Sequence, residues 1–299
     1  MKHTENIKGS RLANAWAELQ SHAAQGHELA ADTYRLAFAD PQFMLRRETR
    51  GLRMQLEMLK PELEMQALGI ENTVVVYGSA RFISPSQAEK KLKSAQEAND
   101  AALIQQAQMQ LKNSHYYHQA RLFGRLVASY GGSNSSNDKQ SESCKPNKDR
   151  LYICTGGGPG IMEAANRGAH DVGALTIGLN ITLPHEQSGN RFITPSLNFK
   201  FHYFALRKMH FMIRAKALVV FPGGMGTLDE LFEVLTLVQT RKSQPVPIIL
   251  FGTSYWKQLI NFDAMVEAGT ISKEDLDLFH YTDDPQEAWD IIRNFYKLE

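Results

Sequence analysis

The pattern of apolar positions changes at about residue 70. Before it, strand signals are almost absent, and PQFMLRRETRGLRMQLEMLKPELEMQALG spaces residues such as Leu52, Leu56 and Leu63 along one face of a helix. Pro61 can open a helix but breaks a continuous one, so we expect two helices that meet there. Residues 1–69 are predicted to form a helical N-terminal extension that packs on the body of the protein or on a second subunit.

After this point, short apolar runs alternate with helical stretches. The runs are TVVVYG, LYICTGGG, ALTIGLNI, ALVVFPGG, VPIILFG and, as the weakest, DLFHYT. Such alternation is typical of βαβ units, whose parallel sheet is covered by helices on both faces. Residues 70–299 are therefore predicted to form one α/β domain with a parallel sheet.

A long insertion, at about residues 84–150, separates the first two runs. SQAEKKLKSAQEANDAALIQQAQMQLKN is a polar helical run, and SHYYHQARLFGRLVASYGG has the apolar spacing of a crossover helix. GGSNSSNDKQSESCKPNKDR is rich in Gly, Ser, Asn and charge. We expect an added helical element, then the crossover helix, then an exposed and mobile loop without chemistry.

Composition limits the classes of partner. The chain of 299 residues carries 33 basic and 32 acidic side chains, which leaves no strong field for steering toward nucleic acid or an anionic membrane. Its N-terminus lacks an apolar signal core, and no apolar run reaches the roughly 18 residues of a membrane span. Two cysteines, Cys144 and Cys154, fit neither a disulfide framework nor a metal quartet, which favours a reducing cytosol and a core role for Cys154. We expect a cytoplasmic protein that binds neither nucleic acid nor membrane.

Candidate chemistry lies in three loops that follow apolar runs. In an open parallel sheet, ligands bind beyond the carboxyl ends of the strands, where loops lead into helices. In VVVYGSAR, Gly78 permits a tight turn, and Ser79 and Arg81 are placed to hydrogen-bond an anion. This loop alone is a weak signal, because a turn of small residues after a strand is common.

The second loop, ICTGGGPGIMEAANRGA, has several glycines ahead of an alanine-rich helix. The residues of interest are Gly156, Gly157, Gly158, Gly160, Met162 and Glu163. Glycines let the backbone approach a phosphate, which exposed N–H groups and the positive end of a helix stabilise. The loop lacks the Lys-Ser/Thr pair of a P-loop and the glycine spacing of a dinucleotide site, so a dinucleotide dehydrogenase is disfavoured. A tight connection without a ligand is the alternative.

The third loop is FPGGMGTLDE. It contains Pro222, Gly223, Gly224, Gly226, Thr227, Asp229 and Glu230. The proline ends the strand, the glycines shape a turn, and the threonine suits a helix N-cap, which places the two acids in the first helical turn. There they would interact favourably with the helix dipole, which is the simplest explanation for them. A carboxylate beside a phosphate-binding turn repels phosphate, however, and is better explained by a nearby centre that becomes positive, such as the anomeric carbon of a nucleotide's ribose.

A specific combination of motifs occurs in GGGPGIMEAANRGA, FHYFALRKMHFMIRAKALVVFPGGMGTLDE and LFEVLTLVQTRK. Together these segments resemble the LOG (Lonely Guy) family, long mislabelled lysine decarboxylase-like, and its bacterial nucleotide nucleosidase relatives. The resemblance extends from about residue 73 to the C-terminus, apart from the insertion, and its GGGxxGxM and PGGxGTxxE pair is highly specific. It implies a Rossmann-like, doubly wound fold and hydrolysis of the N-glycosidic bond of a nucleoside 5′-monophosphate. AMP and its N6-prenylated cytokinin forms are the expected substrates, and free base and ribose 5-phosphate the products.

Family roles carry over to the matching positions. The essential glutamate of PGGxGTxxE falls on Glu230 and the family's Arg-Lys pair on Arg207 and Lys208, so Glu230 and Arg207 are the expected catalytic residues. The expected substrate-binding residues are Ser79, Arg81, Gly156, Gly157, Gly158, Gly160, Met162, Lys208, Gly223, Gly224, Gly226 and Thr227. Many members have Glu where this chain has Asp229, which puts a direct role for that residue in doubt.

The expected chemistry follows from the bond that breaks. A ribosidic C–N bond breaks through an oxocarbenium-like state, which needs negative charge near the ribose and an activated water. We expect Glu230 to hydrogen-bond the ribose hydroxyls, stabilise the cation and orient or deprotonate water. Arg207 would anchor the phosphate or ribose and position the purine. Arginine holds its proton tightly, which leaves the proton source for the departing base open.

Neither a metal nor a cofactor is expected. His202 and His210 lie about two helical turns apart without a carboxylate or cysteine at metal-ligand spacing, and Lys208 lacks the partners of a pyridoxal lysine. In LPHEQSGNRF, we expect substrate contacts from His185, Glu186, Gln187 and Asn190. The resemblance suggests a homodimer or higher oligomer, with the helices that follow the glycine loops at its interface. The alternative function is a non-catalytic carrier of nucleotides or molybdenum cofactor from the same superfamily.

Overall fold

The computed structural model describes residues 36–130, 150–182 and 189–298. Several predictions concern residues outside these ranges, namely Cys144, the loop at 131–149, and His185, Glu186 and Gln187. The chain divides into two compact units, residues 1–57 and 58–299. Among the described helices, none combines the length and the apolar character that crossing a membrane requires.

Short helical elements make up the described part of the first unit. These are η2 (Ala37–Ala39), α2 (Pro41–Met44) and the beginning of α3 (Arg50–Ala67). Asp40 caps α2, because its carboxylate accepts hydrogen bonds from the backbone N–H groups of Gln42 and Phe43.

Helix α3 continues through Pro61, so the expectation of two helices meeting there is wrong. A proline inside a helix removes one backbone hydrogen bond. Tertiary contacts within the second unit offset that loss: Pro61 is buried, and Arg214 makes a bidentate ion pair with Glu62 at 2.6 Å. In addition, Nε2 of His210 donates to the carbonyl oxygen of Met58 at 3.0 Å, so this histidine has a structural contact.

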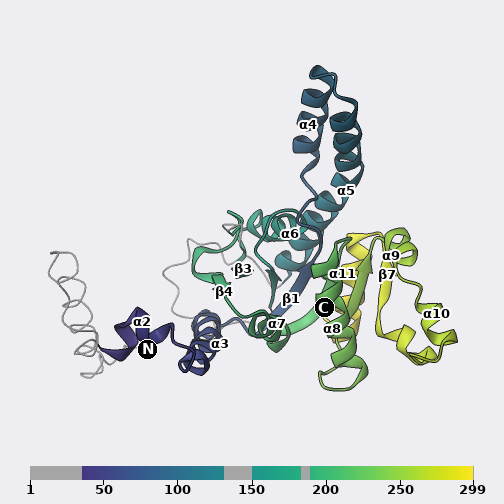
Figure 1. Ribbon diagram of the computed structural model, residues 1–299. Coiled ribbons are helices and arrows are strands. Elements are labelled where there is room, and N and C mark those ends of the chain that lie inside the picture. Colours follow the sequence, from purple (N-terminus) through teal and green to yellow (C-terminus); the bar gives the residue numbers. More distant parts are fainter. Residues whose placement is uncertain (1–35, 131–149, 183–188, 299) are drawn as a thin grey trace. The chain divides into compact units, whose positions relative to one another are not determined.

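A seven-stranded parallel sheet organises the second unit (Figure 1). Its strands are β1 (Asn72–Tyr77), β2 (Leu151–Thr155), β3 (Thr176–Ile181), β4 (Asn198–Phe201), β5 (Ala215–Val220), β6 (Ile248–Phe251) and β7 (His280–Thr282). They lie side by side in the order β4-β3-β2-β1-β5-β6-β7. All six expected runs are strands, and only the short edge strand β4 was missed.

Helices cover both faces of the sheet, which confirms the doubly wound α/β fold. The helices of this unit, after α3, are α4 (Pro85–Glu97), α5 (Ala101–Ser129), α6 (Ile161–His170), α7 (Phe204–Ile213), α8 (Met225–Gln239), α9 (Thr253–Leu259), α10 (Phe262–Glu267) and α11 (Pro285–Tyr296), with η3 (Pro195–Leu197) and η4 (Lys273–Leu278). On one face, Val76 and Val219 belong to a core built with α5, α6 and α11. On the other, the ring of Tyr77 packs edge-on against Phe211 of α7, with centroids 5.0 Å apart.

The insertion contains a helical hairpin (Figure 1). Ser84 and Gln87 form a capping box at the start of α4, and Asp100 caps α5 by accepting from the N–H groups of Ala102 and Leu103. The second half of α5 buries Phe123 and Val127 in the core, so the predicted crossover helix is confirmed. It is longer than expected, because the second part of the polar run, from Ala101, shares one helix with the apolar-spaced run.

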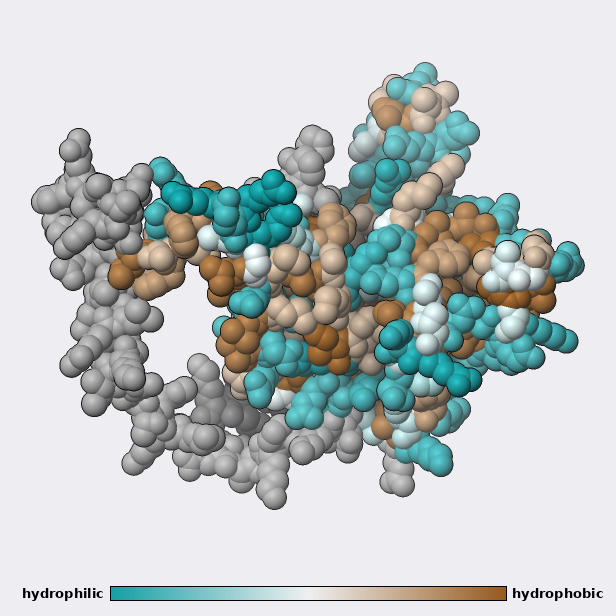
Figure 2. All heavy atoms as spheres, turned by 60° about the horizontal axis from the view of Figure 1, so that its bottom comes forward, coloured by the Kyte–Doolittle hydropathy of each residue, from teal (hydrophilic) through white to brown (hydrophobic). Residues whose placement is uncertain are grey.

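Apolar residues gather in patches on the face shown in Figure 2, with polar residues around them. The large apolar side chains exposed on α7 and α8 are Phe204, Met209, Ile213, Met225 and Phe232.

Candidate active site

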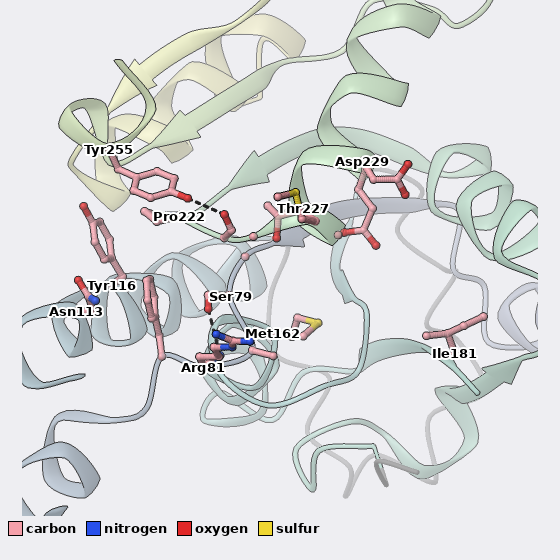
Figure 3. Close-up of a pocket in the computed structure, with 18 of the residues that line it drawn as sticks. Ser79, Arg81, Asn113, Tyr116, Met162, Ile181, Pro222, Thr227, Asp229 and Tyr255 are labelled. Carbon is pink, nitrogen blue, oxygen red and sulfur yellow. Dashed lines mark hydrogen bonds between the residues drawn. The ribbon is translucent and has the colours of Figure 1, made fainter. Parts of the chain in front are cut away.

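The candidate site lies where strands β1 and β5 end side by side. From β1 the chain crosses through α5 to β2, and from β5 it crosses through α8 to β6 in the opposite direction along the sheet. Such a switch point leaves a crevice at the carboxyl ends of the strands. Here it is a cleft of about 850 Å³ (Figure 3). Its two central loops are joined directly, because the N–H of Ser79 donates to the carbonyl oxygen of Pro222 at 2.9 Å.

Most of the motif residues meet in this cleft, although they come from four distant segments. Its lining includes Ser79, Arg81, Met162, Arg207, Gly223, Gly224, Gly226, Thr227, Asp229 and Glu230. Figure 3 shows Thr227 and Asp229 on one side of the cleft and Ser79, Arg81 and Met162 on the other. Their roles toward a substrate remain predictions.

Helix α8 begins earlier than expected. Its N-cap is Gly224 and its first residue is Met225, so Thr227 lies within the first turn and the prediction of Thr227 as the N-cap is wrong. The expected placement of Asp229 and Glu230 in the first turn is also wrong, because no acidic residue lies there. The helix dipole acts mainly within the first turn, so it does not account for the two acids.

The start of α8 provides backbone donors beside the cleft. The first N–H groups of a helix have no partner within it, and residues 224–226 are exposed along the cleft wall. Two contacts fix the turn that precedes them. A Cβ atom on Gly223 would lie 2.2 Å from Oγ1 of Thr227, and the hydroxyl of Tyr255 donates to the Gly223 carbonyl at 2.6 Å. Only glycine fits at this position, and the turn can hold an anion at the helix N-terminus.

A buried ion pair lies farther along the cleft. Nη1 of Arg207 is 3.0 Å from Oε1 of Glu230, and the two side chains are only 9% and 13% exposed. Arg207 is also held by its Nε, which donates to the Leu179 carbonyl at 2.6 Å, and by the face of Phe211, 4.9 Å away. Burial raises the pKa of Glu230 to about 7, although Arg207 opposes the shift. This carboxyl group can therefore change its charge near neutral pH.

Lys208 lies beside this pair but does not line the cleft. Its Nζ is 2.7 Å from the Asp229 carboxylate and 3.0 Å from that of Glu233, so it joins α7 to α8. Burial lowers the pKa of Lys208, but hydrogen bonds to the two carboxylates outweigh this effect and leave the pKa raised. Asp229, whose position had no explanation in the sequence, is thus paired with Lys208.

The glycines of the second loop are buried behind the residues that line the cleft. Gly160 has φ +75°, and a Cβ atom there would lie 2.3 Å from the backbone oxygen of Ser79. At Gly156 a Cβ atom would lie 2.5 Å from Nη2 of Arg207 and 2.8 Å from Sδ of Met162. These glycines let other groups approach closely, whereas the sequence predicted that they face the substrate.

A buried polar network holds this loop. The side-chain amide of Asn190 donates to the carbonyl oxygens of Gly157 and Gly158 and to Oδ1 of Asn166. Asn166, with no exposed surface, also accepts from Thr155 and donates to Thr176. Asn190 was expected to contact the substrate, whereas here its contacts are with the protein.

One wall of the cleft was missed by the sequence analysis. It includes Phe82, Lys112, Asn113, Tyr116, Ser254, Tyr255 and Gln258. The rings of Phe82 and Tyr116 stack with centroids 5.8 Å apart and an angle of 15° between planes. Helices α5 and α9 supply most of these residues, and only the folded topology brings them to the site, so no local motif identifies them. Within the described ranges, no group of His, Cys, Asp and Glu residues is arranged to hold a metal ion.

The chain is similar to proteins of established family. The family model described as possible lysine decarboxylase matches residues 162–292. The cytokinin riboside 5′-monophosphate phosphoribohydrolase LOG4 of Arabidopsis thaliana is 30% identical over 161 residues, which cover 50% of this chain and 73% of the relative. LOG3 of the same plant and of the same named activity is 31% identical over 138 residues, which cover 45% of this chain and 62% of the relative. The match to LOG3 thus spans less than two thirds of that protein.

Solved structures share the fold only distantly. The molybdenum cofactor carrier protein from Chlamydomonas reinhardtii is 15% identical, with a TM-score of 0.43, and the match covers 76% of this chain and 99% of that one. A likeness of this size has no bearing on function. The similarity to LOG4, and the meeting of the PGGxGTxxE residues with Arg207 in one cleft, lead to one conclusion: the chain belongs to the LOG family.

Proposed function

We propose that this protein hydrolyses the N-glycosidic bond of a nucleoside 5′-monophosphate to free base and ribose 5-phosphate. The observation that carries the proposal is the position of Glu230, a buried carboxyl group that lines the same cleft as the glycine turn before α8. The names of the relatives LOG3 and LOG4 support the same reaction class.

The turn and the start of α8 are suited to the 5′-phosphate. Backbone N–H groups and the positive end of the helix favour an anion, and Ser79 and Arg81 extend the cleft opposite them. Glu230 follows the turn by about one helical turn, which leaves room for a ribose between the phosphate and the carboxylate.

Glu230 would act at the ribose. The C–N bond breaks with positive charge on the anomeric carbon and ring oxygen, and an ionised carboxylate close to them stabilises that charge more than it stabilises the substrate. With a pKa of about 7, Glu230 is also basic enough to accept a proton from water as it attacks. The electron pair of the broken bond leaves with the base, which takes up a proton from solvent to give the free base.

Arg207 would act by position and charge. Its guanidinium is fixed by Leu179, Phe211 and Glu230, so it presents one rigid cation next to the carboxylate. Arginine keeps its proton in proteins, so Arg207 serves to anchor the substrate and to hold Glu230 in place.

A non-catalytic carrier is the competing function. It would be favoured by a glutamate directed away from the phosphate-binding turn, whereas Glu230 and the turn line one cleft. The hydrolase is therefore the better-supported of the two.

Product analysis tests the proposal directly. Purified protein, treated with a chelator, is incubated with a panel of nucleoside monophosphates that includes AMP and N6-modified AMP, and free base is measured by chromatography. We expect base release from at least one member, no release by the Glu230→Gln variant, and normal release by Glu267→Gln, which alters an exposed carboxylate of α10. Tight nucleotide binding without release of base from any member would favour the carrier.

We also propose the base, the oligomeric state and the location. The named substrates of the relatives support adenine or N6-modified adenine as the base. Exposed apolar side chains on α7 and α8, close to the cleft, support a homodimer or a higher homo-oligomer. A cytoplasmic location and a helical extension at residues 1–69 complete the proposal.

A further inference from the structure

We infer that Lys208 and Asp229 form a positioning pair that holds Glu230 against Arg207. The inference rests on the proposed function. It assigns a role to two charged residues whose contacts lie outside the chemistry described above.

Two neighbouring bridges join α7 to α8. Arg207 pairs with Glu230 at 3.0 Å inside the cleft. The residue after Arg207 pairs with the residue before Glu230, because Nζ of Lys208 lies 2.7 Å from the Asp229 carboxylate. Lys208 also reaches Glu233, at 3.0 Å, one helical turn beyond Asp229. A single lysine thus contacts carboxylates on both sides of Glu230 within about one turn of α8.

The contacts of Lys208 use its charge within the protein. Its side chain is 18% exposed and its ammonium group faces two carboxylates, whereas a substrate-binding lysine would direct that group into the cleft. The described residues that line the cleft include Asp229 and Glu230 but not Lys208. The lysine therefore fixes the distance between the helices from the outer side of the ion pair.

The charges of Lys208 and Asp229 also act on the pKa of Glu230. Asp229, Glu230 and Glu233 bring three carboxylates onto one short stretch of α8, and Lys208 is the cation that bridges the outer two. The groups that act on Glu230 are Arg207 and Lys208, which lower its pKa, and Asp229, which raises it. From β1, the neutral phenol of Tyr77 also lies within electrostatic range. Removal of the Lys208 charge should therefore raise the pKa of Glu230, and removal of the Asp229 charge should lower it.

The test compares Lys208→Met, Lys208→Arg and Asp229→Asn with the wild type. We expect Lys208→Met to lower kcat about tenfold at neutral pH with KM changed less than about threefold, since positioning acts on the reaction and not on substrate affinity. The pKa read from the pH profile should rise in Lys208→Met and fall in Asp229→Asn, each by about half a unit. Lys208→Arg should restore most of kcat, because it keeps the bridging charge.

Two outcomes would overturn the inference. A large rise in KM with unchanged kcat in Lys208→Met would show that the lysine contacts the substrate. Unchanged kcat and an unchanged pH profile in both variants would show a surface bridge without influence on the site. Circular dichroism is used to check that each variant is folded. If Lys208→Met does not fold, Asp229→Asn still tests the pair, because it alters an exposed side chain.

A second readout separates this inference from the proposed function. The Glu230 carboxyl pKa can be followed by carbon NMR in the absence of any nucleotide, with Glu230→Gln to assign the signal. Opposite shifts in Lys208→Met and Asp229→Asn would support the pair even in a protein that releases no base. Shifts in the same direction, or none, would refute it.

Discussion

Nη1 of Arg207 lies 3.0 Å from Oε1 of Glu230 at the junction of α7 and α8. The two residues belong to different motifs of the sequence, and they lie on the helices that directly precede and follow β5. Despite its cationic partner, Glu230 has a pKa of about 7, since the loss of solvent outweighs the attraction.

The first prediction concerns the pH dependence of activity. The ionised form of Glu230 is required, so kcat/KM should rise about tenfold per pH unit on the acidic side and level off above about pH 7. The measurement is kcat/KM for AMP across the pH range in buffers of constant ionic strength. If kcat/KM instead falls as the pH rises through 7, the protonated form of Glu230 is the active one.

The second prediction concerns stability. The folded-state pKa of Glu230 lies above the ordinary value of 4.5, so between these values the folded protein keeps a proton that the unfolded chain has lost. The stability contribution of this group therefore falls as the pH rises through that window, by about 3 kcal/mol in total. Urea unfolding of wild type and Glu230→Gln at several pH values should show that the free energy of unfolding of the wild type falls relative to that of the variant as the pH rises. A difference that stays constant with pH would contradict this.

The third prediction distinguishes the roles of two glycines. Gly160→Ala combines a left-handed backbone with a contact of 2.3 Å to the Ser79 oxygen, and should lower the free energy of unfolding by about 2 kcal/mol or more. Gly226→Ala is the matched control for stability, because a Cβ atom there meets nothing within 4 Å. Thermal unfolding compares the two. Equal melting temperatures would mean that the loop at 156–160 yields more easily than its packing indicates.

The fourth prediction concerns two exposed cations that line the cleft. Arg81 and Lys112 are cations on the cleft lining and are exposed, so they should attract the phosphate without taking part in bond breaking. Arg81→Gln should raise KM for a monophosphate about threefold to tenfold, with little change in kcat and a smaller effect at high salt. Lys90→Gln on α4, which does not line this cleft, is the control. A fall in kcat with KM unchanged would place Arg81 in the reaction itself.

The sequence was sufficient to predict the parallel sheet and to locate the central motifs. Apolar runs bounded by glycine and proline identified six strands, and the strand ends located the loop that carries Ser79 and the turn that precedes Glu230. The sequence did not predict β4, because this strand has only four residues, NFKF. Only Phe199 and Phe201 are buried, so the alternation is too short to form a clear pattern.

The errors share a physical cause, which is that local signals were overruled by packing. Thr227 has the preference of an N-cap, yet its hydroxyl fits against Gly223 and the helix begins at Met225. Pro61 would end an isolated helix, yet contacts of its neighbours keep α3 continuous. Residues such as Tyr116 and Gln258 carry no local motif, because their place at the cleft depends on crossover geometry.

Helix α5 also determines where the chain can change length. Its Asn113 and Tyr116 line the cleft, and two turns later Phe123 enters the core. One residue inserted between them would rotate one group relative to the other by about 100° and would misalign either the wall or the core. Residues added or removed at the tip of the hairpin, before Lys112, disturb neither. The tip of the α4–α5 hairpin can therefore vary in length, whereas α5 from Lys112 onward must keep its register.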